Sequence, residues 1–143
     1  CRKAGVDGLI VPDLPPEESQ ELQHLSGVNG LDLIYLLAPT STEERIRVVA
    51  ERSRGYIYLV SVAGVTGARQ DVPQYLPDFV SRVRRIARQP LCVGFGISSP
   101  GQAAQIARIA DGVIIGSKII QLIKSDPSLV SLKSFLESTR TLL

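Results

Sequence analysis

The chain has 143 residues, 44% hydrophobic and 21% charged, which is ordinary for a globular protein large enough for one hydrophobic core. Its net charge of +2 gives no indication of binding to nucleic acid or to an anionic membrane. No apolar run approaches the ~20 residues of a membrane span, and two cysteines are too few for a disulfide framework. We expect one domain over residues 1–143, in a reducing compartment, without nucleic-acid or membrane partners.

In chain order, short apolar runs alternate with amphipathic stretches. The predicted elements are a strand at 8–11, a helix at 16–25, a strand at 33–37, a helix from 41 or 42 to 53, a strand at 56–60, a helix at 78–88, a strand at 91–95, a helix at 99–109, a strand at 112–115, and helices at 118–124 and 128–142. None of the strands alternates cleanly between polar and apolar residues. Such runs are typical of parallel strands that are covered on both faces.

Capping residues support the predicted helix starts. Ser41 or Thr42 precedes two glutamates, and Ser99 precedes Pro100, so each helix has a hydroxyl acceptor for its first free N–H groups. Asp126-Pro127 breaks the last two helices apart. The outer side of the helix at 78–88 is predicted to be a solvated face, formed by Arg82, Arg84, Arg85 and Arg88.

Strand–helix alternation over the whole chain predicts an α/β fold with a parallel sheet. Two architectures fit: an open doubly wound sheet, or a partial barrel with five of the eight strands of a (βα)8 TIM barrel. The loop at 63–77, rich in Gly and Pro, favours the barrel because it resembles an active-site loop. The chain begins without Met, in what reads as the tail of a helix, and we expect it to be a piece of a longer protein.

Two glycine-bearing strand ends predict a phosphate site. Gly94-Phe95-Gly96 and Gly116-Ser117 each follow an apolar run and precede a helix. Helix starts expose unpaired N–H groups at the positive end of the helix dipole, and glycine lets an anion approach them. In (βα)8 barrels such a site follows strands 7 and 8. The alternative interpretation is that the glycines only relieve crowding at the turns.

Two other interpretations are weak. Gly94-x-Gly96-x-x-Ser99 lacks the third glycine of a dinucleotide fingerprint and follows the fourth strand, not the first. Asp13 after the first strand and Lys118 after the fifth have the positions of an acidic residue and a lysine in a phospho-receiver domain. The third strand, however, ends in Val60-Ser61, without a phosphoacceptor aspartate. The chain also offers no His/Cys cluster for a metal and no catalytic triad.

Other candidate residues have two interpretations each. Asp13 follows the first strand and is either a base or hydrogen-bonding carboxylate, or a cap for the next helix. Tyr56 and Tyr58 share one face of their strand and either line a pocket or pack in the core. Thr66, between two glycines, fits a lid over a phosphate or an ordinary turn. His24, the only histidine, is predicted to be exposed.

Five motifs are spread over nearly all of the chain: Ala4-Gly5-Val6-Asp7-Gly8-Leu9-Ile10-Val11-Pro12-Asp13-Leu14-Pro15, Arg54-Gly55-Tyr56-Ile57-Tyr58-Leu59-Val60-Ser61, Gly64-Val65-Thr66-Gly67-Ala68, Gly94-Phe95-Gly96-Ile97-Ser98-Ser99-Pro100 and Gly116-Ser117. Together these motifs carry a resemblance to the α subunit of tryptophan synthase. It implies a (βα)8 barrel that cleaves indole-3-glycerol phosphate to indole and glyceraldehyde 3-phosphate. It also implies an α2β2 complex that passes indole to a β subunit, which alone carries pyridoxal phosphate, in the bacterial cytoplasm or the plastid stroma.

The resemblance also implies roles for single residues. The substrate phosphate would be held by Gly67, Gly96, Gly116 and Ser117. The pocket would be lined by Tyr58, Phe95, Ile10, Pro12 and Ile114, with Thr66 in the lid loop.

The acid and base of the reaction are not among these residues. The family places a Glu and an Asp at and just after strand 2, and the first run here corresponds to strand 4. Asp13 matches a family aspartate that is not the principal acid or base. Two alternatives therefore stay open: a scaffold that only binds phosphate, or another phosphate-binding barrel such as indole-glycerol-phosphate synthase or thiamin-phosphate synthase.

Overall fold

The computed structural model describes residues 1–61, 72–94 and 96–143. Its strands are β1 (Gly8–Ile10), β2 (Asp32–Ile34), β3 (Leu36–Leu37), β4 (Ile57–Val60), β5 (Leu91–Gly94) and β6 (Gly112–Ile114). Its helices are the 3₁₀ turns η1 (Arg2–Ala4) and η2 (Pro16–Glu18), and α1 (Gln20–Val28), α2 (Glu43–Arg52), α3 (Leu76–Arg84), α4 (Pro100–Ala107), α5 (Ser117–Ser125) and α6 (Val130–Leu142). Among the described residues, no helix is long and apolar enough to cross a membrane.

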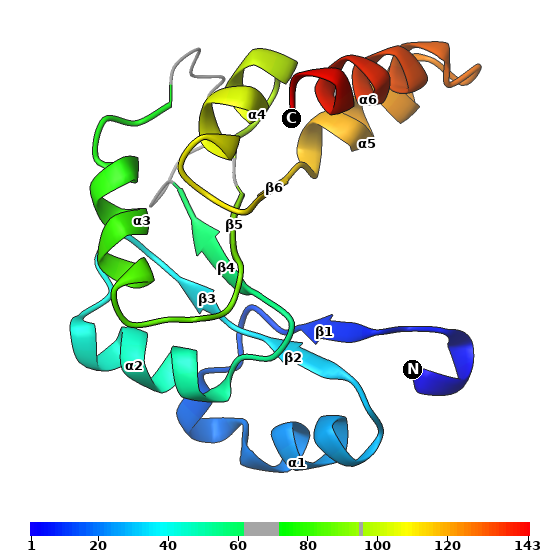
Figure 1. Cartoon of the computed structure of the whole chain (residues 1–143). Helices are drawn as coiled ribbons and strands as arrows, with labels where there is room; N and C mark the ends of the chain where they lie inside the picture. The colour runs from blue at the N-terminus through cyan, green and yellow to red at the C-terminus, as the bar shows by residue number, and fades with distance from the viewer. Residues whose placement is uncertain (62–71, 95) are drawn as a thin grey trace.

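Every strand pair in the described chain is parallel, as predicted. β1 pairs with β2, and β3, β4, β5 and β6 follow one another in a second ladder. Figure 1 shows the strands as a curved row with α1, α2, α3 and α4 along its outer side. The arrangement is that of a partial barrel, because a curved parallel sheet covered by helices on its outer side is the barrel geometry.

The strand predicted at 33–37 is divided in two by Tyr35, which corrects the single strand expected there. The Tyr35 N–H donates to Ser53 Oγ at 3.2 Å, and its carbonyl accepts from the Tyr58 N–H at 3.1 Å. The segment before Tyr35 therefore pairs with β1 and the segment after it pairs with β4. One strand thereby changes its neighbour at the point where the sheet turns.

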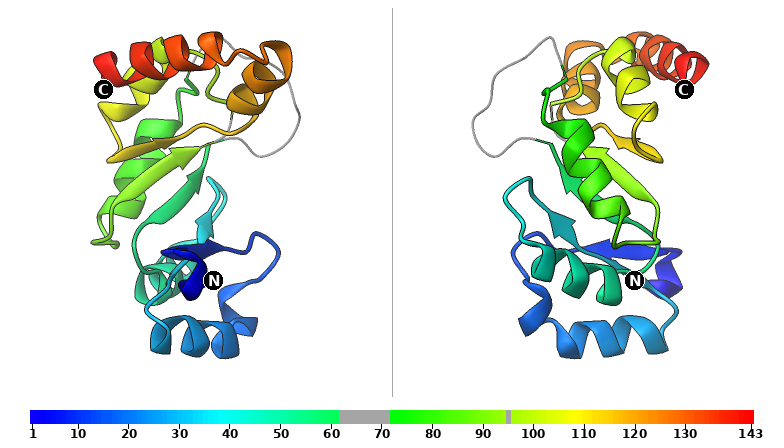
Figure 2. Two further views of the ribbon diagram at one scale, coloured as in Figure 1. Left: turned by 90° about the vertical axis from the view of Figure 1, so that its right-hand side faces the viewer. Right: turned by 60° about the vertical axis from the view of Figure 1, so that its left-hand side comes forward.

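Side chains on the two faces of the sheet have different surroundings. The outer face carries the buried core, in which Ile57 and Leu59 of β4 pack with residues of α2 and α3. The alternate residues face inward, and the register aligns Leu36, Tyr58, Cys92 and Gly112 in one layer. All four inward residues are only half-buried. Helices are visible on the outer side in both views of Figure 2.

Most predicted helix boundaries are confirmed to within about two residues. Thr42 caps α2, since its hydroxyl accepts from the Arg45 N–H at 3.2 Å. The helix predicted at 16–25 instead begins as the turn η2, and α1 continues to Val28. The helix predicted at 78–88 runs from Leu76 to Arg84.

The basic face of α3 is not wholly solvated. Arg82 lies over the Phe79 ring at 5.6 Å and donates to the Pro39 carbonyl at 2.5 Å. Arg84 forms an ion pair with Asp111 at 2.5 Å. Two of the four arginines therefore have partners in other segments of the protein, which amphipathic spacing alone did not show.

Candidate functional site

The two glycine-bearing turns lie at the same end of neighbouring strands. Gly94, at the end of β5, is in register with Ile114, at the end of β6. Gly96 and Gly116 each follow two residues later, so the turns leave the sheet side by side, one strand spacing of ~4.8 Å apart. Gly96 has a φ of 78°, a left-handed conformation that disfavours any other residue.

The two helices that follow these turns begin differently. At α4, Ser99 Oγ accepts from the Gln102 N–H at 3.2 Å, while Gln102 Oε1 accepts from the Ser98 and Ser99 N–H groups at 2.8 and 3.2 Å. Ser99 and Gln102 thus form a complete capping box, and Pro100 at the first position has no N–H. The start of α4 therefore offers fewer free donors than predicted, because the N–H groups of Ser98, Ser99 and Gln102 already have side-chain acceptors.

The start of α5 is open. Gly116 is its N-cap, no side chain of the described residues accepts from its first N–H groups, and both Gly116 and Ser117 are exposed. The free donors, the positive end of the helix dipole and the Ser117 hydroxyl together form an anion site. Ser117 is the first helical residue, one position earlier than predicted.

The inward face beside these turns is a partly apolar wall formed by Tyr58 and Ile114. A methyl group placed at Gly94 would overlap the Tyr58 hydroxyl and lie 3.0 Å from Ile114 Cβ. Gly94 therefore leaves the space that the Tyr58 side chain occupies. Burial, and secondarily the neighbouring Tyr56, raises the pKa of the Tyr58 phenol, which stays neutral and able to donate a hydrogen bond at physiological pH.

Cys92 and Gly112 belong to the same layer of the inner face as Tyr58. A methyl group at Gly112 would lie 2.8 Å from Cys92 Sγ. Cys92 is a free thiol and is half-buried. Burial, followed by the Asp111 carboxylate, raises the pKa of this thiol, so it is not an activated nucleophile.

The end of β1 contributes Ile10 and Pro12 at the far edge of the described sheet. Both are exposed, Ile10 at 41%. Asp13 is also exposed, and within the described residues no side chain, that of Asp13 included, caps η2 or α1, so the interpretation of Asp13 as a cap is wrong. It remains a carboxylate at the carboxyl end of the strand.

Several predicted site residues lie outside the described residues. These are Thr66 and Gly67 of the proposed lid loop, and Phe95 of the pocket.

The part that Gln102 plays in the capping box was not predicted from the sequence. The signal was present as Ser99-x-x-Gln102, the spacing of a capping box directly before a helix. The predicted Ser99 cap accounts for one N–H group of α4, whereas the Gln102 side chain satisfies two N–H groups directly before the helix, those of Ser98 and Ser99.

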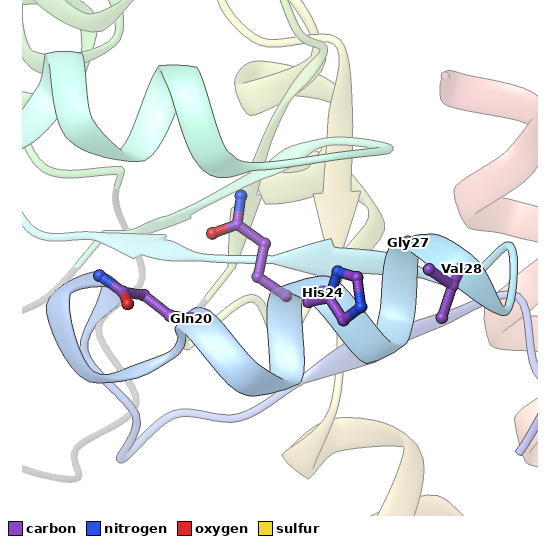
Figure 3. A pocket seen from close by; sticks show the side chains of 5 residues that line it. Gln20, His24, Gly27 and Val28 are labelled. Atoms are coloured by element: carbon purple, nitrogen blue, oxygen red, sulfur yellow. The ribbon is translucent and has the colours of Figure 1, made fainter.

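Outside the strand ends, an open hollow lies along α1 (Figure 3). Its lining comes from α1 alone: Gln20, Gln23, His24, Gly27 and Val28. His24 is exposed there, as predicted. Within the parts of the chain that the structure covers, no three His, Cys, Asp or Glu residues gather as metal ligands would.

Comparison with known proteins agrees with this architecture. A family model described as "Tryptophan synthase alpha chain" matches residues 1–141. A protein of that name from Dehalococcoides mccartyi is 56% identical over 140 residues, which are 98% of this chain and 55% of the relative. Another, from Methanocaldococcus jannaschii, is 44% identical over 124 residues, covering 87% of this chain and 44% of the relative.

Solved structures give the same result. A Mycobacterium tuberculosis tryptophan synthase structure has a TM-score of 0.88 and 41% identity, over 99% of this chain and 53% of that one. The Pyrococcus furiosus tryptophan synthase α2β2 complex has a TM-score of 0.87 and 32% identity, over 98% of this chain and 58% of that one.

The parallel strands, outer helices and open helix start after the last strand define a protein of the (βα)8 barrel class. The chain belongs to the tryptophan synthase alpha chain family. It spans about half the length of the curated relatives that it matches. The family match decides against the receiver domain, the dinucleotide-binding sheet and the other phosphate-binding barrels.

Proposed function

We propose that this chain is the phosphate-binding part of a tryptophan synthase alpha chain. In that protein, a lyase of tryptophan biosynthesis, indole-3-glycerol phosphate undergoes retro-aldol cleavage to indole and glyceraldehyde 3-phosphate. The observation that carries the proposal is the uncapped start of α5 at Gly116 and Ser117, beside the Gly96 turn.

In this proposal the phosphate dianion accepts from the first N–H groups of α5 and from the Ser117 hydroxyl. Charged hydrogen bonds to a helix start are stronger than neutral ones. Gly96 and Gly67 bring further backbone to the phosphate, and Thr66 belongs to the lid. The glycerol and indole parts of the substrate extend along the inner face past Tyr58 and Ile114, toward Ile10 and Pro12, and the family resemblance adds Phe95 to this pocket.

The cleavage needs one group that protonates indole C3 and another that accepts the hydroxyl proton. No residue of this chain matches the two carboxylates that the family uses. We therefore propose that the 143-residue chain binds the phosphate end of the substrate without cleaving it. The lyase activity belongs to a protein that also carries the remaining strands.

The partner in this proposal is a tryptophan synthase β subunit in an α2β2 assembly. Pyridoxal phosphate is held there, and this chain holds no cofactor. We place the protein in the bacterial cytoplasm or the plastid stroma, where tryptophan biosynthesis takes place.

Calorimetric titration of this chain with glyceraldehyde 3-phosphate, and with unphosphorylated glyceraldehyde, tests the proposal. We expect binding only of the phosphate ester, and no indole release from indole-3-glycerol phosphate. Ser117→Ala should weaken the binding of the phosphate ester about tenfold, because it removes one charged hydrogen bond. Ser125→Ala, at the other end of α5, is the matched control and should change nothing. Equal affinity for the two aldehydes would refute the phosphate site, and indole release would refute the claim that this chain only binds.

A further inference from the structure

The starts of α4 and α5 stand side by side, yet only one of them is open. β5 and β6 are neighbours in register, so an anion at the strand ends meets both helix dipoles. At α4 the N–H groups of Ser98, Ser99 and Gln102 already have side-chain acceptors, while at α5 no side chain among the described residues caps the first N–H groups. The two helix starts therefore differ in how many N–H groups they leave for an anion.

Gln102 is the residue that completes the capping box of α4. It is 7% exposed, and its Oε1 atom accepts three hydrogen bonds, from the N–H groups of Ser98 and Ser99 and from the Ser98 hydroxyl at 3.1 Å. It thus occupies the place that an anion would take at the start of α4. The same contacts hold the segment directly after Gly96, whose left-handed turn leads into it.

Gln102 carries no charge, and this matters electrostatically. Glutamate is the other residue that completes a capping box, and it would satisfy the same N–H groups. A carboxylate there would also add a negative charge near a phosphate dianion bound at the neighbouring strand end. Salt screens charges over a Debye length of about 8 Å, so it would only partly screen the repulsion between neighbouring strand ends.

We propose that Gln102 is a positioning residue for the substrate phosphate: it closes the start of α4 with a neutral acceptor, and so directs the phosphate to the open start of α5. The inference rests on the proposed function, because it presumes a phosphate ligand at Gly116 and Ser117. It adds a residue that does not touch that ligand and controls where the ligand binds.

The test is a ¹⁵N NMR titration of the chain with inorganic phosphate, following the backbone amides of Ser98, Ser99, Gly116 and Ser117. Gln102→Glu keeps the capping box and adds the charge. Gln105→Glu is the matched control, since it makes the same change at an exposed position of α4 one turn further on. Gln102→Ala removes the acceptor and frees the two serine amides.

In the unmodified chain, phosphate should shift the Gly116 and Ser117 amides and leave Ser98 and Ser99 unmoved. Gln102→Glu should weaken this binding about tenfold, and Gln105→Glu by less than twofold. In Gln102→Ala, the shifts should spread to Ser98 and Ser99. A residue with only a structural role would not redistribute the shifts in this way, and the spectrum of each variant reports whether it is folded.

The outcomes separate the two proposals. If phosphate binds and Gln102→Glu behaves like Gln105→Glu, the positioning role is wrong and the phosphate site stands. If Gln102→Glu does not fold, Gln102→Ala decides, and unmoved Ser98 and Ser99 amides in that variant overturn the inference. If the unmodified chain shows no shift at Ser117, the phosphate site fails and the role of Gln102 fails with it.

Discussion

Gly94 and Tyr58 share one space on the inner face, and neither can enlarge without displacing the other. The Tyr58 ring and hydroxyl lie where a Cβ of residue 94 would be, and Ile114 closes the other side. A tightly packed interior transmits such an overlap to its neighbours because it has few voids to absorb it. The glycine thus fixes the position of a tyrosine that borders the proposed pocket.

Gly94→Ala is predicted to destabilise the chain by about 1–3 kcal/mol, the usual range for overpacking. Adding Tyr58→Leu, which removes both the hydroxyl and the atom that bears it, should recover much of that loss. Urea unfolding of the single and double variants measures this coupling. Gly101→Ala is the control, because a methyl group there meets nothing within 4 Å. Additive effects of the two substitutions would refute the shared-space interpretation.

Prediction from the sequence was least complete for the contacts of single side chains. Gly96 and Gly116 were recognised because glycine before a helix has few alternative explanations. The partners of Arg82 and Arg84 were not recognised, because Pro39 and Asp111 are far away in the sequence and helical periodicity carries no information about them.

Between elements, Asp111 joins three segments at the amino end of the sheet. Its carboxylate accepts from the Leu91 N–H at 2.7 Å, at the start of β5, and from Arg84 at the end of α3. The backbone hydrogen bond from Leu91, with a smaller contribution from Arg84, lowers the pKa of Asp111. The residue therefore ties β5, β6 and α3 at the end opposite to the proposed site.

Since folding lowers the pKa of Asp111, its contribution to stability is present above the ordinary carboxylate pKa of about 4. It is lost as the pH falls through the lower folded value. Urea unfolding between pH 6 and 3 should show a steeper loss of stability for the unmodified chain than for Asp111→Asn. The difference should be about 1 kcal/mol or less, because the pair is partly exposed. Parallel curves for the two proteins would contradict the assignment.

The strands and helices were predicted from the sequence more completely than the side-chain contacts were. All five apolar runs form strands, because their continuous apolar character leaves no alternative in a parallel fold. The division at Tyr35 could not be predicted, since it depends on Ser53 as a hydrogen-bond acceptor 18 residues away. The break at Asp126-Pro127 was predicted from the proline. It was not predicted that the Asp126 carboxylate accepts from the N–H groups of Ser128, before α6, and Ser131, within it.

For the whole molecule, the edges of the sheet are the decisive feature. Among the described strands, β1 pairs only with β2 and β6 pairs only with β5, so each leaves one side of its backbone unpaired. Ile10 on β1 is 41% exposed, and Ile120 and Ile123 of α5 are exposed as well. Unpaired edges flanked by apolar side chains favour association with another chain.

We predict that the 143-residue chain associates increasingly as its concentration rises, through these edges. Ile10→Lys should shift it toward the monomer, because a lysine on an edge strand opposes strand pairing. Sedimentation equilibrium over a range of concentrations measures this. Val28→Lys, on the exposed side of α1, adds the same charge away from any strand edge and should have little effect. A monomer at all concentrations, with cooperative unfolding, would refute the prediction.

The change of strand partner at Tyr35 has a consequence for how the molecule opens. On either side of this residue the backbone ladders are separate, while Leu33, Tyr35 and Leu37 all contribute to one continuous core. Local opening can therefore release the amides of β1 and β2 to solvent exchange while the β4–β5 ladder stays closed. Amide protons that exchange fast would then lie before Tyr35, in β1 and β2, and amide protons that exchange slowly would lie after it. The N–H of Tyr35 itself donates to a serine side chain, that of Ser53.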